Sequence, residues 1–141
     1  MSQFVVSVTR FRVRSLRFLP FFLFHAQRCL AQIRRADGYM AGALRHERDH
    51  AYWTTSVWRD EAALLAYVSG GAHRDAMPKL SEWGDEASTV RWVQDSAEPP
   101  SWPEAIERMR HKGHPLPLRH PGPEHAGLGW ATSEPPQTSR T

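Results

Sequence analysis

The sequence predicts one α+β domain in which an antiparallel sheet carries its helices on one face. Three observations lead to this fold class. Four segments have the composition of β-strands, two regions between them have helical periodicity, and together they follow the order β-α-β-β-α-β. That order is the split βαβ, or ferredoxin-like, arrangement, with the helices on one side of the sheet. At 141 residues, the chain can bury a core without metal or disulfide staples.

The first strand and the first helix are expected in the first quarter of the chain. Phe4 to Val13 is rich in valine, phenylalanine and threonine, which favours a strand. Apolar residues recur at steps of three and four from Leu16 to Ile33, as in an amphipathic helix. Pro20 fits the first turn of that helix, where a missing N–H costs little. Asp37-Gly38 is expected to end it.

The rest of the pattern follows between Tyr39 and Gln94. Asp60 is expected to cap a second helix. Gly70-Gly71 interrupts this helix, which then resumes. The remaining strands are predicted at 39–45, 52–58 and 89–94, and the resumed helix at about 73–83.

The third strand has two apolar faces. Trp53 and Val57 should point to one side of the sheet, and Tyr52 and Trp58 to the other. A sheet with helices on one side only should have a polar second face. We therefore expect a second subunit to cover that face, which makes the protein a homodimer.

The composition changes near Ser96. Nine of the eleven prolines follow Gln94, so we expect a compact domain at 1–95 and a Pro-rich extension at 96–141. Within the extension, Ser101-Trp102-Pro103-Glu104 has capping-box spacing and predicts a short helix near 102–111. From Pro115 onward the composition favours irregular chain.

Charge and composition argue against several classes of partner. Residues 1–35 hold seven arginines and no acid, but the rest of the chain is near balance, so no nucleic-acid partner is expected. The most apolar stretch, residues 18–24, is far shorter than the roughly 20 residues of a spanning helix, so no membrane partner is expected. The single cysteine, Cys29, fits a reducing compartment, and a cytoplasmic protein is predicted.

Two stretches, Ser56–Leu64 (SVWRDEAAL) and Gly71–Met77 (GAHRDAM), resemble the dimeric α+β-barrel superfamily, which includes the antibiotic-biosynthesis monooxygenases. Within it the chain most resembles an uncharacterised domain-of-unknown-function family, over roughly residues 4–110. That likeness rests on Glu82-Trp83, Arg91-Trp92-Val93 and Pro100–Ala105. The resemblance implies a dimeric α+β barrel. By analogy it also implies a monooxygenase-like oxidoreductase for an apolar or aromatic small molecule, either cofactor-free or heme-dependent.

His73 is the candidate catalytic residue. It follows Gly70-Gly71, where the chain can turn sharply and a polar group can face a cavity. A similar Gly-x-His stretch occurs in members of the superfamily that bind heme. A neutral imidazole could serve as an axial ligand or as a base near its free pKa of about 6.5. The alternatives are a histidine that caps the helix start and, at the level of function, a non-catalytic dimer that binds heme or another hydrophobic ligand.

Several aromatic residues are candidates for substrate binding. They are expected to converge on the sheet and the second helix, where a flat apolar substrate or a porphyrin would fit. Large aromatics at strand spacing also fit a plain core. The candidates are His25, Tyr52, Trp53, Tyr67, Trp83 and Trp92, with Trp58 beside them.

The string His46-Glu47-Arg48-Asp49-His50 matches the H-E-x-x-H motif of zinc peptidases. That chemistry needs a helix, with both histidines on one face as ligands and the glutamate as the base. The segment Thr54–Val57 that follows is strand-like, and Gly38 and Gly42 before it are poor in a helix. A charged hairpin turn is predicted, with no metal site, and a zinc hydrolase is the third and weakest alternative.

Overall fold

The structure, a computed structural model, describes residues 3–131. Its sheet has five strands in the order β2-β3-β1-β4-β5, and all neighbours are antiparallel. The strands are β1 (Phe4–Val13), β2 (Tyr39–Glu47), β3 (Ala51–Trp58), β4 (Gly84–Gln94) and β5 (His114–Pro115). The predicted β-α-β-β-α-β order is confirmed, and β5 is a short addition at the edge beside β4.

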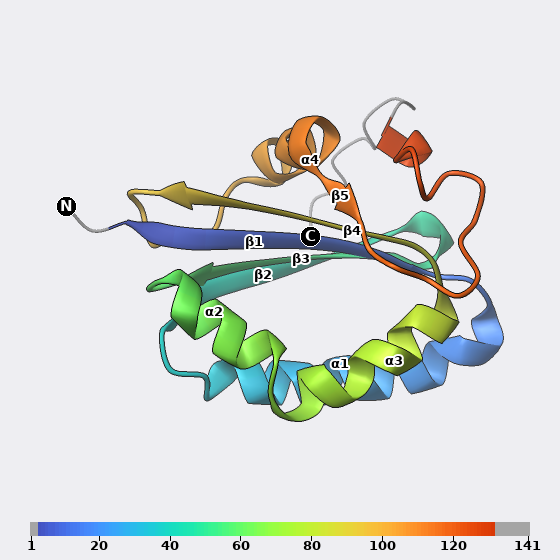
Figure 1. Ribbon diagram of the computed structural model, residues 1–141, viewed down its shortest axis with the longest axis horizontal. Helices are drawn as coiled ribbons and strands as arrows, with labels where there is room; N and C mark the ends of the chain where they lie inside the picture. Colours follow the sequence, from blue (N-terminus) through green and yellow to red (C-terminus); the bar gives the residue numbers. More distant parts are fainter. Residues whose placement is uncertain (1–2, 132–141) are drawn as a thin grey trace.

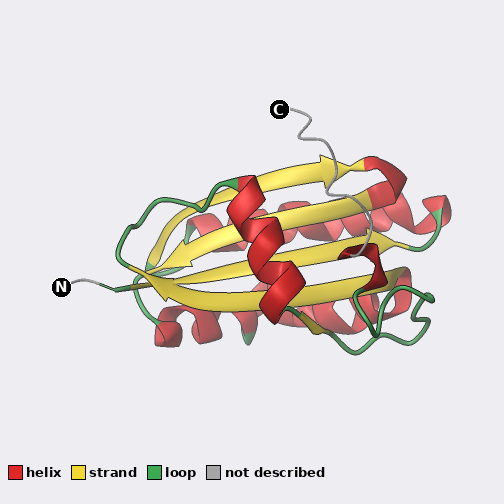
Figure 2. Ribbon diagram, turned by 90° about the horizontal axis from the view of Figure 1, so that it is seen from above, coloured by secondary structure: helices red, strands yellow, loops and turns green. Residues whose placement is uncertain are grey.

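Helices lie on both faces of the sheet (Figure 1). On one face are α1 (Leu19–Arg34), α2 (Glu61–Val68) and α3 (Gly71–Trp83); α4 (Trp102–Lys112) lies on the other. Figure 2 shows α4 crossing the strands. Three short 3-10 turns, Leu16–Phe18, Arg48–His50 and Gly129–Ala131, complete the elements. We call the face under α1, α2 and α3 the helix face, and the other the α4 face.

The α4 face is covered in part by this chain itself. Buried residues of α4 pack on the apolar centre of the sheet. The helix contributes Ala105, Ile106 and Met109, and the sheet contributes Val6, Val8, Trp53, Val57 and Val90. The helix starts at Ser101, whose hydroxyl accepts a hydrogen bond from the Glu104 N–H at 3.3 Å, as the capping box predicts. We expected a second subunit to cover this face; α4 does so here. The apolar face therefore does not by itself require a partner, and the homodimer stays a prediction.

β4 begins at Gly84 rather than at the predicted Thr89. The extra segment lacks strand-forming residues, but tertiary contacts hold it in the sheet. A Cβ on Gly84 would collide with the Phe11 ring, so glycine permits this close approach. Glu86 is held by Arg10, whose Nη1 lies 2.6 Å from Glu86 Oε1. Contacts of this kind override weak local strand preference.

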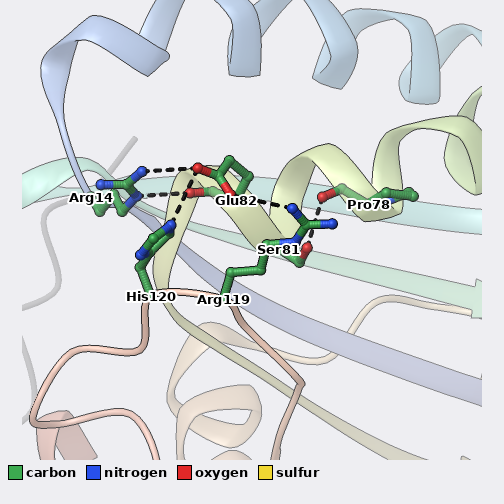
Figure 3. Close-up of polar contacts among 6 residues, drawn as sticks. All are labelled: Arg14, Pro78, Ser81, Glu82, Arg119 and His120. Atoms are coloured by element: carbon green, nitrogen blue, oxygen red, sulfur yellow. Dashed lines mark hydrogen bonds and ion pairs between the residues drawn. The ribbon is translucent and has the colours of Figure 1, made fainter.

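A small ion-pair cluster fastens the end of α3 (Figure 3). Arg14 donates from Nε to the main-chain oxygen of Glu82 at 2.7 Å, and its Nη2 lies 3.3 Å from Glu82 Oε1. His120 Nε2 lies 3.2 Å from the same carboxylate oxygen, and Arg119 Nη1 lies 3.8 Å from Oε2. The guanidinium groups of Arg14 and Arg119 also suit the negative end of the helix dipole. The cluster joins β1, α3 and the segment after β5.

Candidate functional site

Two apolar clusters hold the helices against the helix face, one at each end of the sheet. The first contains Phe11, Val13, Phe22 and Ala87, with Tyr52 and Trp83 packed against it. The second contains Trp58, Ala63 and Leu64, with Tyr39 and Tyr67 packed against it. The sheet between these clusters carries small polar side chains instead.

Strand register aligns these polar side chains in two rows across β3, β1 and β4. They face the helices because Tyr52 and Trp58, on the same face of β3, pack against α1 and α2. Some are bonded within the sheet: Thr89 donates its hydroxyl hydrogen to the Val8 carbonyl at 3.1 Å. The polar rows, as we call them below, are Thr54–Thr9–Thr89 and Ser56–Ser7–Arg91.

The polar rows are open to solvent at the β2 edge of the sheet. Thr54 is exposed although it lies on an inner strand and faces the helix layer. Its neighbour on β2, Leu44, is 53% exposed. Gly42, which lies opposite Ser56, is exposed as well. The helices therefore leave this part of the sheet uncovered. We call the region between the sheet and α1, α2 and α3 the interlayer.

His73 stands on the helix side of the interlayer, and Gln32 of α1 fixes its position. The chain turns between α2 and α3 at Gly70 and Gly71, and Gly71 has a φ of 54°, which favours glycine. Gln32 Nε2 donates to the carbonyls of Tyr67 and Gly70 at 3.0 and 2.9 Å, and its Oε1 accepts from the His73 N–H at 2.8 Å. One side chain thus bonds both sides of the helix break.

The ring of His73 has one defined tautomer. Its Nδ1 lies 3.1 Å from the carbonyl oxygen of Val68. A carbonyl oxygen only accepts, so Nδ1 carries the hydrogen and Nε2 keeps a lone pair. Burial lowers the pKa of His73; the bond to Val68 opposes this shift, and the positive charge of Arg91 adds to it. The ring is therefore neutral near pH 7 and presents a basic nitrogen.

Tyr67 links His73 to the aromatic cluster beneath α2. Its ring centroid lies 5.0 Å from that of His73 and 5.2 Å from that of Trp58. Its hydroxyl donates to the Cys29 carbonyl at 3.3 Å. Burial raises the pKa of Tyr67 well above its usual value, so the phenol stays neutral. Tyr67 and His73 are therefore neighbours in the structure.

His25, Tyr52 and Trp83 lie at the other end of the interlayer. His25 is 8% exposed, and its ring centroid lies 5.5 Å from that of Trp83. Burial lowers its pKa, and the charges of Lys79 and Arg28 lower it further. Among the described residues, its Nδ1 has no hydrogen-bond partner. This histidine is a second neutral nitrogen base on the helix face.

Trp53 and Trp92, also predicted to bind substrate, lie on the α4 face. Trp53 is packed under α4, and its Nε1 donates to Glu47. The guanidinium of Arg108, from α4, lies 4.4 Å from the Trp92 ring centre. The predicted aromatic set is therefore divided between the two faces of the sheet, and only His25, Tyr52, Tyr67 and Trp83 can share a site with His73.

The H-E-x-x-H string forms the predicted hairpin turn rather than a helix. His46 is on β2 and stacks on Tyr52 on the helix face, with ring centroids 4.7 Å apart. Glu47 bonds to Trp53 on the opposite face. Asp49 and His50 both have a φ of 63° in the turn. The two candidate ligands, His46 and His50, and the candidate base, Glu47, therefore do not form a zinc-peptidase site. Residues 3–131 contain no cluster of three or more His, Cys, Asp or Glu suited to a metal.

A shallow surface depression of about 670 Å³ lies between the end of α1 and α2, and its lining includes Gln32 and Tyr67, the neighbours of His73. Its charged residues are largely satisfied by one another. Arg59 Nη2 lies 3.2 Å from Asp37 Oδ2, and its Nε lies 3.3 Å from Asp60 Oδ2. All three side chains are at least half exposed, so the depression offers weak, solvent-screened contacts. We favour the interlayer because it has a neutral histidine at each end, His73 and His25, with an aromatic side chain beside each.

Comparisons with known proteins define the family and fold of the chain. A family model described as "Domain of unknown function (DUF3291)" matches residues 26–141. No curated protein matches the chain. Among the described residues, no helix is long and apolar enough to cross a membrane.

Three solved structures illustrate the fold. The chain is similar to SnoaB, a cofactor-independent oxygenase from Streptomyces nogalater, at 20% identity and a TM-score of 0.52 over 73% of this chain and 99% of that one. A candidate antibiotic biosynthesis monooxygenase from Nitrosomonas europaea is 11% identical, with a TM-score of 0.60 over 67% of this chain and 93% of that one. A Bacteroides thetaiotaomicron protein of unknown function, described as a possible oxidoreductase, is 15% identical, with a TM-score of 0.55 over 66% of this chain and 98% of that one. These likenesses confirm the predicted fold class.

Proposed function

We propose that this chain, which belongs to the DUF3291 family of domains of unknown function, is a monooxygenase-like oxidoreductase for an apolar or aromatic small molecule. The substrate would lie in the interlayer, between the polar rows and the inner faces of α1 and α3. The observation that carries the proposal is the tautomer of His73, whose Nδ1 bonds to Val68 and leaves Nε2 as a base. The oxygenase among the structures of the same fold supports the proposal by analogy.

The parts of the interlayer suit different parts of such a substrate. Aromatic side chains at both ends, among them Tyr52 and Tyr67, suit flat apolar rings. The hydroxyls of the polar rows can orient an oxygen atom of the substrate. Arg91 can stabilise negative charge on that oxygen once the substrate has lost a proton. Apolar contacts would therefore come from the two ends of the interlayer, and polar and charged contacts from the sheet.

The reaction that fits this arrangement starts with proton abstraction. His73 Nε2 takes a proton from an acidic C–H or O–H group, which makes the substrate electron-rich. Dioxygen is then the oxidant. A substrate CH2 group that becomes C=O gives its two hydrogens to one oxygen atom, which leaves as water, while the other oxygen atom stays on carbon. The deprotonated substrate itself supplies the electrons.

Dioxygen uptake tests this function. Purified protein would be mixed with a panel of aromatic ketones and phenols in an oxygen electrode, beside the His73→Asn variant. Asparagine can keep the donated bond to Val68 but has no basic nitrogen. We expect the wild type to consume oxygen with at least one compound and the variant to lose about 100-fold or more in rate. Equal rates in the two proteins would contradict the role of His73.

A heme-binding protein is the second candidate, because the same Nε2 lone pair can bind a heme iron. Bound heme would supply redox or ligand-binding chemistry at that nitrogen, and Arg91 could pair with a heme carboxylate. Hemin titration tests this alternative. A Soret band that forms with the wild type and is lost in His73→Asn would support it over the cofactor-free reaction.

A further inference from the structure

A second polar group lies on the α4 face, apart from the interlayer. Cross-strand register places Arg45 of β2, Trp53 of β3 and Arg10 of β1 in one row. Thr55 lies two residues beyond Trp53 on the same face. Arg45 is only 4% exposed and Thr55 only 3%. The proposed function gives these buried polar side chains no role.

The two arginines of this row differ in their partners. Arg10 Nη1 lies 2.6 Å from Glu86 Oε1, and its guanidinium lies 4.3 Å from the ring centre of Trp130. Within residues 3–131, by contrast, Arg45 forms no ion pair or side-chain hydrogen bond, and its Nε is buried without a partner. Arg10 therefore has a counter-charge and Arg45 lacks one.

The neighbours of Arg45 leave it unpaired. Glu47, on the same face of β2, accepts a hydrogen bond from Trp53 Nε1 and forms no ion pair with Arg45. The Thr55 hydroxyl is also buried without a partner in the described part of the chain. Register makes Thr55 a diagonal neighbour of Arg45, a separation that a long side chain can span. A cation and a hydroxyl, each with a buried atom that has no partner among the described residues, are thus diagonal neighbours on this face of the sheet.

A buried guanidinium without an anion is costly, because it has lost its water and gained no partner. Its planar fork of N–H groups matches a carboxylate, which it can bind through two parallel hydrogen bonds. The Thr55 hydroxyl can donate a third. Arg45 lies on β2, an edge strand of the described sheet, so no further strand flanks it on the outer side.

We propose that Arg45 and Thr55 form a binding site for a small organic carboxylate. The site is separate from the interlayer and does not depend on the proposed oxygenase activity. Arg45 supplies the charge and Thr55 a further donor.

Benzoate is the probe for this site. Thermal unfolding would be followed while sodium benzoate replaces sodium chloride at constant ionic strength. We expect a saturable rise of the wild-type midpoint and the same rise in Arg48→Met, a matched control in the exposed β2–β3 turn. The rise should vanish in Arg45→Met. Thr55→Val, which keeps the side-chain shape, should weaken benzoate binding about tenfold.

The same variants show whether Arg45 is unpaired in the free protein. Without benzoate, Arg45→Met should unfold at a higher temperature than the wild type, because it removes a buried charge that has no partner. A lower midpoint would mean that Arg45 is already paired, and would overturn the proposal. So would equal benzoate shifts in wild type and Arg45→Met, no shift in the wild type, or a shift with inorganic phosphate alone.

Discussion

The Gln32 side chain accepts a hydrogen bond from the main-chain N–H of His73 at 2.8 Å, and this bond ties α1 to the start of α3. The same amide donates to Tyr67 and Gly70 on the other side of the helix break. The position of His73 therefore depends on a residue 41 positions earlier in the chain. Sequence reasoning missed Gln32, because an amide inside an amphipathic helix has no local signal.

Replacing Gln32 should lower stability and disturb the site together. Gln32→Met keeps the length of the side chain but removes three hydrogen bonds and leaves the His73 N–H without its partner. We therefore expect a loss of about 1–3 kcal/mol in the free energy of unfolding. Urea denaturation would measure it. Gln27→Met, an exposed position on the same helix, is the control and should change stability by less than about 0.5 kcal/mol. Equal effects at both positions would show that the three bonds contribute nothing.

Two variants of His73 should separate its structural role from its chemical role. His73→Ala removes the bond to Val68 as well as the base, and should cost about 1–3 kcal/mol. His73→Asn can keep a donor at the place of Nδ1, so its unfolding midpoint in urea should stay close to that of the wild type. If both variants lose ligand binding or activity but only His73→Ala loses stability, the two roles are distinct. If His73→Asn keeps full activity, His73 is structural.

Stability should fall in mild acid. Burial lowers the pKa of both His25 and His73 in the folded protein, whereas in the unfolded chain each titrates near 6.5. Above about pH 6.5 neither state is protonated and their contribution is complete. As the pH falls below that value, the unfolded chain binds protons that the folded chain does not, and the free energy of unfolding decreases. Urea titrations at pH 7.5 and 5 should show this loss, and a smaller one in His73→Asn. Equal losses in both proteins would show that His73 does not contribute.

The packing of α4 can be tested at one methionine. Met109 is fully buried against the sheet, whereas Met77 on α3 is 38% exposed. Met109→Ala should cost about 2–5 kcal/mol, and Met77→Ala about 1 kcal/mol or less. Thermal or urea unfolding would compare them. Similar small losses would mean that α4 is not part of the folding unit.

The predicted homodimer can be tested by measuring the mass of the protein in solution. Light scattering at micromolar concentration should give about twice the chain mass of 16.1 kDa. Because α4 occupies part of the apolar face, we expect the contact to involve other surfaces, such as the edge strand β2 with its exposed Met40 and Leu44. A monomer mass would reject the dimer.

Local sequence patterns were sufficient to predict most of the fold. Periodicity and caps predicted β1 to β3, α1 and the short helix α4 within a few residues. They could not show that α4 packs back on the sheet, because the periodicity of a helix shows which of its faces is apolar but not which surface that face contacts. Irregular chain was predicted after Pro115. There, His125 is buried: its Nδ1 accepts from the Ala87 N–H at 3.2 Å and its Nε2 donates to the Leu116 carbonyl at 2.8 Å.

The candidate site could be predicted only in part. His73 stands out because it follows two glycines, but the polar rows emerge only from strand register. Alternation in β1, with Val6 and Val8 on one face and Ser7 and Thr9 on the other, was a signal that could have suggested a polar face. Alternation along β3 separates Trp53 from Tyr52, as in the structure. The predicted set of substrate-binding aromatics nevertheless contained both, because it was based on side-chain type and not on alternation.

Nitrogen NMR of the histidine rings tests the central claim most directly. His73 should show a protonated Nδ1 and an unprotonated Nε2, and His125 in the same spectrum should show the opposite tautomer. Added 2-naphthol, an aromatic probe with one acidic hydroxyl, should shift the Nε2 signal of His73 and leave His125 unchanged. A hydrogen on Nε2 of His73, or a His73 signal that does not respond to the probe, would contradict a base that faces the interlayer.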